Sequence, residues 1–256
     1  MSKQSETLYL SILIVGVTVG LAAPAGARGW IHPAGFLDVA TLQDIKRKSE
    51  SLDWARQVVE DLDAGVQPWL AQSVERLDAL LPKRKMQVYS MLICPECRGG
   101  LQFNPFNDQD AACRRCEKTI DLDRPSPATD YRGTLYEGWG CSYLQRMAGA
   151  AQQMALLHAL GAERSYAEHA AGILKLFATH IKPLPVLGSG TQTVIWTYNK
   201  EGDCGIVLKL TEAYELLRNV QGLFSPEEHR KIQFDLLKHW VDSVFRVEED
   251  STPRWN

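Results

Sequence analysis

The chain has 256 residues, a formal net charge of −3, and 45% hydrophobic and 23% charged residues, which is ordinary for a globular protein. This length allows one large domain or two small ones. Because the net charge is slightly negative, no overall positive field attracts nucleic acid or anionic lipid, and we expect neither as a partner.

Residues 1–27 have the pattern of a secretory signal peptide. Lys3 precedes an apolar run from Leu8 to Ala23, and the small residues Ala25-Gly26-Ala27 form a cleavage site. A permanent anchor is the less favoured alternative, because the run is short and rich in glycine for a span of about 20 apolar residues. We therefore predict a secreted or periplasmic protein, without membrane attachment after cleavage, whose fold is built from residues 28–256.

The first part of the predicted mature chain is helical. Apolar residues recur at helical spacing from Asp38 to Leu62, and Asp38 or Thr41 is placed to cap the start. A second helix is predicted after Pro68. The period then breaks, and Gln87–Ile93 predicts a short strand that leads into a pair of cysteines.

Four cysteines form two Cys-x-x-Cys pairs, Cys94 with Cys97 and Cys113 with Cys116, with fifteen residues between the pairs. This spacing is typical of four-thiolate zinc sites, in which each turn supplies two ligands. The alternative is two disulfides, which export to an oxidising compartment favours. We predict structural Zn²⁺ in a small β insertion, similar to a zinc ribbon, over about residues 87–120, because so short an insertion has almost no core of its own.

The charges of this insertion argue against nucleic-acid binding. Its basic and acidic residues cancel, whereas affinity for phosphate needs an excess of cations. The basic residues are Arg98, Arg114, Arg115 and Lys118, and the acidic ones are Glu96, Asp108, Asp110 and Glu117. Two further cysteines, Cys141 and Cys204, either pair with each other or are small buried residues, and the sequence does not decide between these.

Helical spacing returns after a loop rich in proline and glycine. One helix is predicted from Trp139 to Leu157 with Gly161 as its C-terminal cap. A second, from Tyr166 to Ile181, follows so closely that the two must be antiparallel neighbours.

The last predicted helices follow a long irregular loop over residues 182–203. One helix spans Ile206 to Val220, and another opens at Ser225, where Glu228 completes a capping box. The predicted fold class is therefore mainly α, built from antiparallel helical hairpins. A solenoid is disfavoured because the sequence shows no repeat of fixed period, so we predict an α/α toroid. We expect this toroid to be incomplete, because four to six helices are too few to close one.

Several short motifs in series resemble one protein family. They are HPAGFLD (His32–Asp38), DWAR (Asp53–Arg56), the stretch HALGAERSYAEHAAGILKLFATH (158–180), and LTEAYELLRN followed by LFSPEEHRKIQFDLL (210–237). Together they resemble the N-terminal portion of the heparinase II/III-like polysaccharide lyases, some of which carry a Cys-x-x-Cys insertion at this place. The chain departs from the family in HPAG, where the family opening has an arginine.

The resemblance implies an N-terminal α/α toroid that acts on uronate-containing polysaccharide by β-elimination. It also implies that the family's catalytic Asn-His pair and Tyr lie beyond the last helix of this chain. No catalytic residue is therefore carried over, and we expect an N-terminal fragment that is inactive as given.

The loop before the helix at Ile206 holds the best candidates for contact with an acidic polysaccharide. Trp196 and Tyr198 offer faces on which sugar rings stack, and Gln192 and Asn199 offer amides for hydroxyl groups. An equally favoured alternative for Trp196 is that it packs the loop onto a helix. Trp139 and Tyr143 begin a helix after a loop, and for these two a place in the core is favoured over a place in the groove.

Two other function classes compete with a lyase. An α/α-toroid glycoside hydrolase needs two carboxylates about 5–10 Å apart, and the acids near loops, among which no pair stands out, are Asp130, Glu137, Glu201 and Asp203. A non-catalytic helical module that binds glycan or protein is the remaining alternative.

Overall fold

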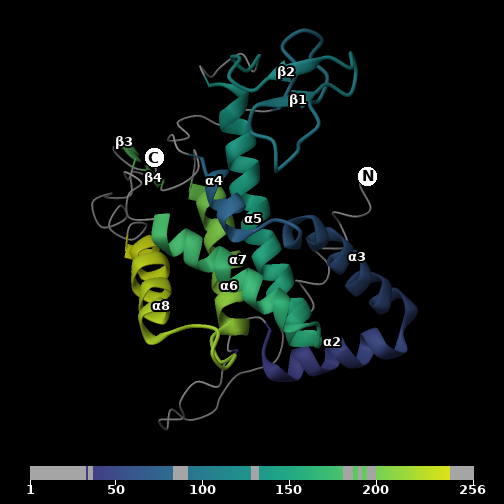
Figure 1. Ribbon diagram of the computed structural model, residues 1–256, viewed down its shortest axis with the longest axis vertical. Coiled ribbons are helices and arrows are strands. Elements are labelled where there is room, and N and C mark those ends of the chain that lie inside the picture. Colours follow the sequence, from purple (N-terminus) through teal and green to yellow (C-terminus); the bar gives the residue numbers. More distant parts are fainter. Residues whose placement is uncertain are drawn as a thin grey trace, which may run out of the picture.

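The computed structural model describes residues 33, 37–82, 92–127, 133–180, 187–189, 192–194 and 200–242, and this part of the chain is mainly helical (Figure 1). The helices are α2 (Val39–Ser51), α3 (Asp53–Leu70), α4 (Val74–Ala79), α5 (Leu135–Leu160), α6 (Arg164–His180), α7 (Lys200–Leu217), α8 (Pro226–Arg230) and the π-helix η1 (Lys231–Lys238). Two antiparallel hairpins pair β1 (Asp110–Ala112) with β2 (Thr119–Asp121) and β3 (Leu187–Ser189) with β4 (Gln192–Val194). The prediction of a mainly α protein is confirmed.

The first helices differ from the prediction in their boundaries. Asp38 caps α2 as expected, since its carboxylate accepts the Thr41 N–H at 2.8 Å. The single helix predicted to reach Leu62 is wrong, because Leu52 is extended (φ −122°, ψ 124°) and separates α2 from α3. The helix predicted after Pro68 is present as α4, but it begins only at Val74. Pro68 itself lies inside α3, where two helical residues follow it and one backbone bond is lost.

The hairpin of α5 and α6 forms as predicted. Gly161 ends α5 in a left-handed conformation (φ 115°), which glycine adopts without strain. Helix α5 packs against α3, α6 and α7 and is buried on most sides. Trp139 and Tyr143 are almost fully buried on it, so both belong to the core and not to a groove.

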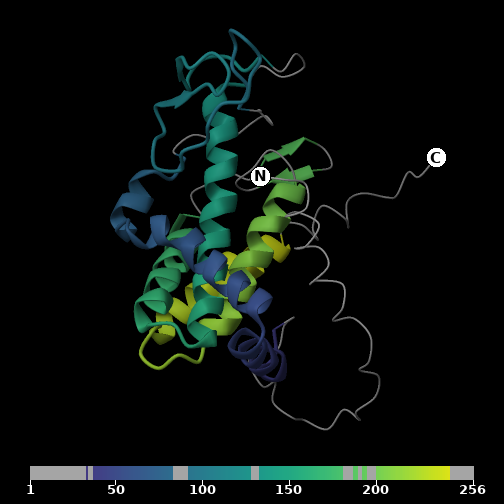
Figure 2. The same ribbon diagram turned by 90° about the vertical axis from the view of Figure 1, so that its right-hand side faces the viewer.

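Helices α5 and α7 lie side by side and run in the same direction. The Lys209 ammonium donates to the Gln145 carbonyl at 3.4 Å, and further along both helices Gln152 contacts Glu212. Because residue numbers rise together along both helices, their N-terminal ends lie at the same end of the helical body. Figure 2 shows the hairpin of β1 and β2 above the start of α5 and that of β3 and β4 at the start of α7.

The region before α7 is more regular than expected. The stretch 182–203, predicted to be an irregular loop, contains the hairpin of β3 and β4, and α7 begins within it at Lys200. After α7, Ser225 caps α8 and forms the predicted capping box: its hydroxyl accepts the Glu228 N–H at 3.2 Å, and the Glu228 carboxylate accepts the Ser225 N–H at 2.7 Å. This box is confirmed because it depends on neighbouring residues alone.

The helices and the cysteine-rich segment share one apolar core. We call residues 92–125 the ribbon. Its buried residues join the same cluster as the buried faces of α5, α6 and α7. The ribbon members of this cluster are Cys94, Leu101, Ala111, Cys113, Ile120 and Leu122.

Candidate metal centre

Each Cys-x-x-Cys pair closes a backbone turn of the same form. In the first, the Cys94 N–H donates to the Gly99 carbonyl at 2.8 Å, and the Cys94 carbonyl accepts the Arg98 N–H at 2.9 Å. The second turn repeats both bonds, at 2.9 Å from the Cys113 N–H to the Lys118 carbonyl and at 3.0 Å from the Glu117 N–H to the Cys113 carbonyl. Two sequences that share only their cysteines thus adopt one geometry.

The residue that follows each pair confirms this likeness. Arg98 and Glu117 both have a φ of 58°, a left-handed conformation that is uncommon outside glycine. Gly99 next to the first turn allows the two turns to approach, because a Cβ there would lie 2.7 Å from the Cβ of Arg115. The predicted strand before the first turn falls mostly outside the described residues, and its last residue, Ile93, forms a bridge with Gly100.

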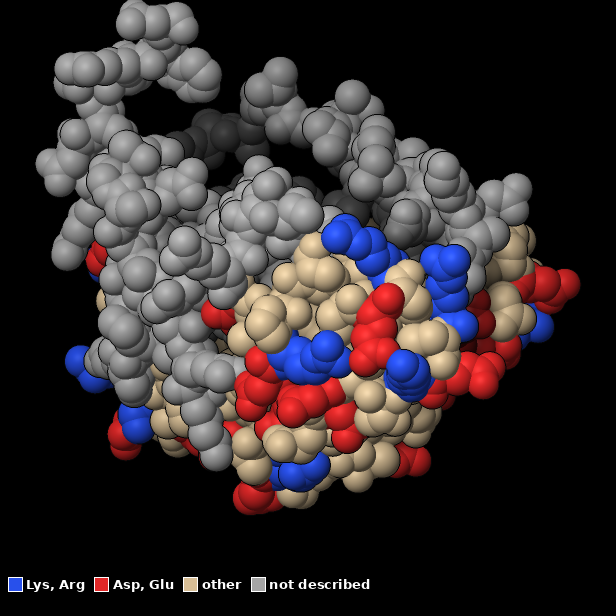
Figure 3. Space-filling model, turned by 90° about the horizontal axis from the view of Figure 1, so that it is seen from above, with Lys and Arg blue, Asp and Glu red and all other residues tan. Residues whose placement is uncertain are grey.

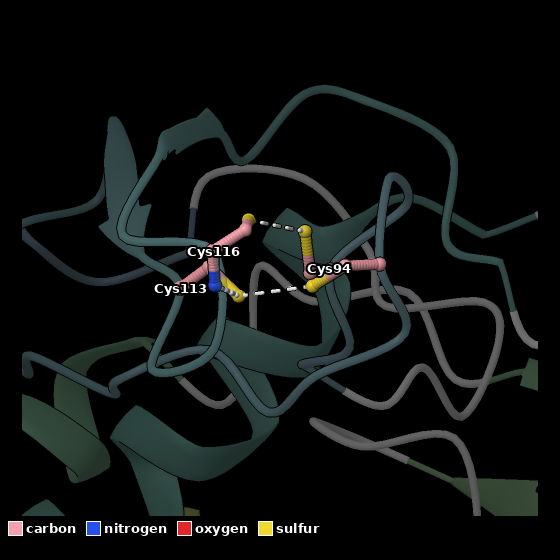
Figure 4. A group of neighbouring side chains, drawn as sticks. Cys94, Cys113 and Cys116 are labelled. Atoms are coloured by element: carbon pink, nitrogen blue, oxygen red, sulfur yellow. Dashed lines mark hydrogen bonds between the residues drawn. The ribbon is translucent and has the colours of Figure 1, made fainter.

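The two turns bring four sulfurs together (Figure 4). All four lie within 4.8 Å of one another, with Sγ–Sγ distances of 3.8 Å between Cys94 and Cys116 and 3.4 Å between Cys97 and Cys113. Four sulfurs at about 2.3 Å from a zinc ion form a tetrahedron with edges of about 3.8 Å, so the cluster fits a four-thiolate metal site. A disulfide needs about 2.05 Å, and none forms among the described cysteines, Cys141 and Cys204 included.

Backbone N–H groups point at the sulfurs and favour thiolate. The N–H groups of Cys116 and Arg115, at 3.5 and 3.4 Å from the Cys113 sulfur, lower the pKa of Cys113 to about 6. At Cys116 the Lys118 N–H acts in the same direction, but burial and the neighbouring thiols outweigh it and raise the pKa to about 12. Four adjacent sulfurs cannot all ionise without a cation between them, which is the situation that a bound metal resolves.

Ion pairs join the ribbon across its two turns. Glu96, between the first two cysteines, contacts the Lys118 ammonium at 2.5 Å and the Arg124 guanidinium at 3.1 Å. These contacts hold the pKa of Glu96 below its ordinary value, through the hydrogen bond from Lys118 first and that from Arg124 second. Seen from above, basic and acidic side chains are interspersed over the described surface, without a wholly basic region on this face (Figure 3).

Of the four residues predicted to contact sugar, the structure describes only the backbone of Gln192. Gln192 is the first residue of β4, which places its backbone in the hairpin before α7. Trp196, Tyr198 and Asn199 lie outside the described residues. The structure therefore leaves the binding role of all four as a prediction.

Among the carboxylates considered for a hydrolase, the structure describes the side chains of Glu137 and Asp203. Glu137 accepts the Thr134 N–H at 3.0 Å and so helps to start α5. Asp203 is buried on α7, while Asp130 and the side chain of Glu201 lie outside the described residues. Glu137 thus has a structural partner that accounts for its position.

Sequence reasoning missed the contacts that fasten the ribbon to the helices. Trp139 on α5 donates its indole N–H to the Asn104 carbonyl at 2.8 Å. Phe106 places its ring against Trp69 of α3, with the centroids 5.1 Å apart. The stretch FNPF (103–106) contains two aromatic residues between charged and polar neighbours, and this was the available signal for a docking loop.

Comparison of the chain with protein-family models, with curated proteins and with solved structures gives no match. Within the part of the chain that the structure describes, none of the helices has the length and apolar character needed to cross a membrane. The function is therefore argued from the cysteine cluster, the arrangement of the helices and the motifs of the sequence.

Proposed function

We propose that this chain is the N-terminal helical part of a secreted polysaccharide lyase that acts on uronate-containing polysaccharide by β-elimination. In this proposal the helical hairpins belong to an incomplete α/α toroid, and the ribbon is a zinc ribbon on its side. The observation that carries it is the parallel course of α5 and α7, which brings the segments leading into both helices to one end of the body.

The positions of the family-like motifs support the proposal. HPAGFLD ends at Asp38, which caps α2. The stretch 158–180 spans the turn between α5 and α6, and the stretch 210–237 spans the turn between α7 and α8. Each resemblance therefore falls on a helix start or a hairpin turn, where a fold constrains its sequence most strongly.

The end of the body at which α5 and α7 begin is the proposed sugar-binding end. The hairpin of β3 and β4 and the predicted contact residues Gln192, Trp196, Tyr198 and Asn199 all precede α7. Aromatic faces there would stack on pyranose rings, and the amides would bind hydroxyl groups. β-Elimination further requires a group that neutralises the uronate carboxylate, a base that removes the C5 proton, and an acid that protonates the leaving oxygen.

The four-cysteine cluster has a structural role in this proposal. When bound, zinc would join the two turns through four thiolates and supply folding free energy that the few apolar residues of the ribbon do not. The residues that hold it are Cys94, Cys97, Cys113 and Cys116. The matched turns and the sulfur separations support a metal over disulfides.

Binding and turnover of polysaccharide test the proposal together. We expect the purified chain to bind polygalacturonate but not neutral dextran, without cleaving it. Trp196→Ala should weaken binding about tenfold through loss of stacking, whereas Trp54→Ala, an exposed tryptophan on α3, should not.

The products separate the alternatives. An unsaturated product that absorbs in the ultraviolet would mean that the catalytic groups lie within this chain. A saturated product would favour a glycoside hydrolase. Absence of binding to pectic, alginate and glycosaminoglycan uronates alike would contradict the proposal.

A further inference from the structure

We infer that the four-cysteine centre controls where α5 begins. With the cluster loaded, the ribbon holds the first turn of α5; when the metal is lost, that turn opens while the rest of the helical body stays folded. This inference rests on the structural metal site proposed above, and it adds a metal-dependent conformational change at the proposed sugar-binding end.

The ribbon supplies the cap of α5. The first N–H groups of a helix have no partner inside the helix and need one elsewhere. Here the Leu135 N–H donates to the Arg124 carbonyl at 3.0 Å, and the Tyr136 N–H donates to the Leu122 carbonyl at 2.6 Å. Both acceptors are backbone groups of the ribbon just after β2, so the start of α5 depends on the position of that strand.

The capping of α5 by its own residues is weaker than that of α8. In α8 the Ser225 hydroxyl accepts the Glu228 N–H, so that helix is capped by its own sequence. At the corresponding position of α5, Thr134 and Glu137 form a capping box, but its buried Thr134 hydroxyl does not complete a well-formed hydrogen bond. The Glu137 carboxylate accepts the Thr134 N–H, and the ribbon carbonyls accept the next two N–H groups, those of Leu135 and Tyr136.

A second contact ties the ribbon to the same turn. The Asn104 carbonyl accepts the Trp139 indole N–H, and the Trp139 ring stacks on Tyr143 with centroids 5.0 Å apart and planes 11° apart. Trp139 is 1% exposed. If the loop around Asn104 moved away, a buried indole N–H would lose its partner, and the start of α5 would be destabilised.

The ribbon depends on its sulfurs to keep these carbonyls in place. Its one hairpin pairs three residues of β1 with three of β2, from Asp110 opposite Asp121 to Ala112 opposite Thr119, and the other pairings are isolated bridges. The strand β2 begins three residues after Cys116, and Leu122 follows it directly. A segment this small does not fold on its own apolar residues, so release of the metal should free the acceptors of Leu135 and Tyr136 together.

The rest of the body has independent support. Helices α6 and α7 both pack against α5, and both carry fully buried apolar side chains, such as Leu174 on α6 and Leu210 on α7. Opening should therefore stop within the first turns of α5. Because α5 and α7 begin at the same end of the body, this is the end whose shape would follow metal occupancy.

Amide hydrogen exchange of the purified full chain, with and without a chelator, tests the inference. We expect removal of the metal to speed exchange of the amides from Leu135 to Trp139 about tenfold or more, together with those of the ribbon. The amides of Leu174 and Leu210 should keep their protection. Metal analysis before and after chelation establishes the occupancy in each sample.

Two variants make the test independent of the chelator. Cys113→Ser should reproduce the faster exchange at the start of α5, and Cys141→Ser, a cysteine on α5 outside the cluster, should not. Unchanged protection from Leu135 to Trp139 while the ribbon exchanges freely would overturn this inference and leave the metal site standing. Loss of protection in every helix at once would also overturn it, and a purified chain without metal would overturn both.

Discussion

The ribbon and the helical body are held together in different ways. The body is organised around α5, whose buried face meets α3, α6 and α7 through fully enclosed apolar side chains. The ribbon has three paired residues in each strand, few buried apolar side chains and four sulfurs within 4.8 Å of one another. The body thus derives its stability from contacts spread over many residues, whereas we propose that the ribbon depends on its four-cysteine centre.

This difference predicts which substitutions have local effects and which lower the stability of the whole protein. A change at a sulfur should remove the organisation of the ribbon and spare most helices. A change in the packed faces of α5, α6 or α7 should lower the stability of the body as a whole, because neighbouring helices share the same core.

The largest contrast should come from Cys113→Ser. We expect metal content to fall from about one ion per chain to none, since three thiolates are left where structural sites use four ligands. Circular dichroism should keep most of its helical signal, because the ribbon contains none of the described helices. Global loss of helix in this variant would show that the ribbon stabilises the entire core, and would contradict the separate stabilisation of ribbon and body.

Leu174→Ala should have the largest effect within the body. Leu174 lies on α6 with no exposed surface, and its truncation should lower the free energy of unfolding by about 2–5 kcal/mol. Urea denaturation measures this loss, and metal content should stay unchanged as the control. A loss below about 1 kcal/mol would mean that α6 is less tightly packed than its burial indicates.

Ser225→Ala tests a helix, α8, whose N-terminus is capped by its own residues. Loss of the hydroxyl that accepts the Glu228 N–H should destabilise the protein by about 1 kcal/mol, measured by urea denaturation. Ser225→Asp should restore most of the stability, because a carboxylate accepts the same N–H. Failure of this rescue would show that the capping bond is not the cause.

Glu96→Gln should have the smallest effect, although it breaks two ion pairs of the ribbon. Both pairs are at the surface, where water and salt screen them. We expect the thermal midpoint to change by about 1 °C or less and metal content to be unaltered. Loss of metal in this variant would mean that charge, and not sulfur, organises the ribbon.

What the sequence predicted correctly is local in origin. The cap at Asp38, the left-handed Gly161 and the box of Ser225 with Glu228 each depend on residues a few positions apart. The same holds for each of the two cysteine turns, because the spacing within each pair shapes its own turn. Such features need no knowledge of distant contacts.

What the sequence did not predict depends on segments far apart in the chain. The break at Leu52 interrupts a continuous helical pattern, and Pro68 stays within α3, where it precedes the buried Trp69. The docking of Asn104 on Trp139 joins residues 35 positions apart. No local propensity encodes these arrangements, because they are decided by packing.

The most direct test of the metal centre is the metal content of the purified chain, measured together with its reactive thiols under denaturing conditions. We predict about one zinc per chain and cysteines of both pairs that react as thiols once the protein is unfolded. A chain without metal, in which Cys94, Cys97, Cys113 and Cys116 do not react because they form disulfides, would contradict this central claim.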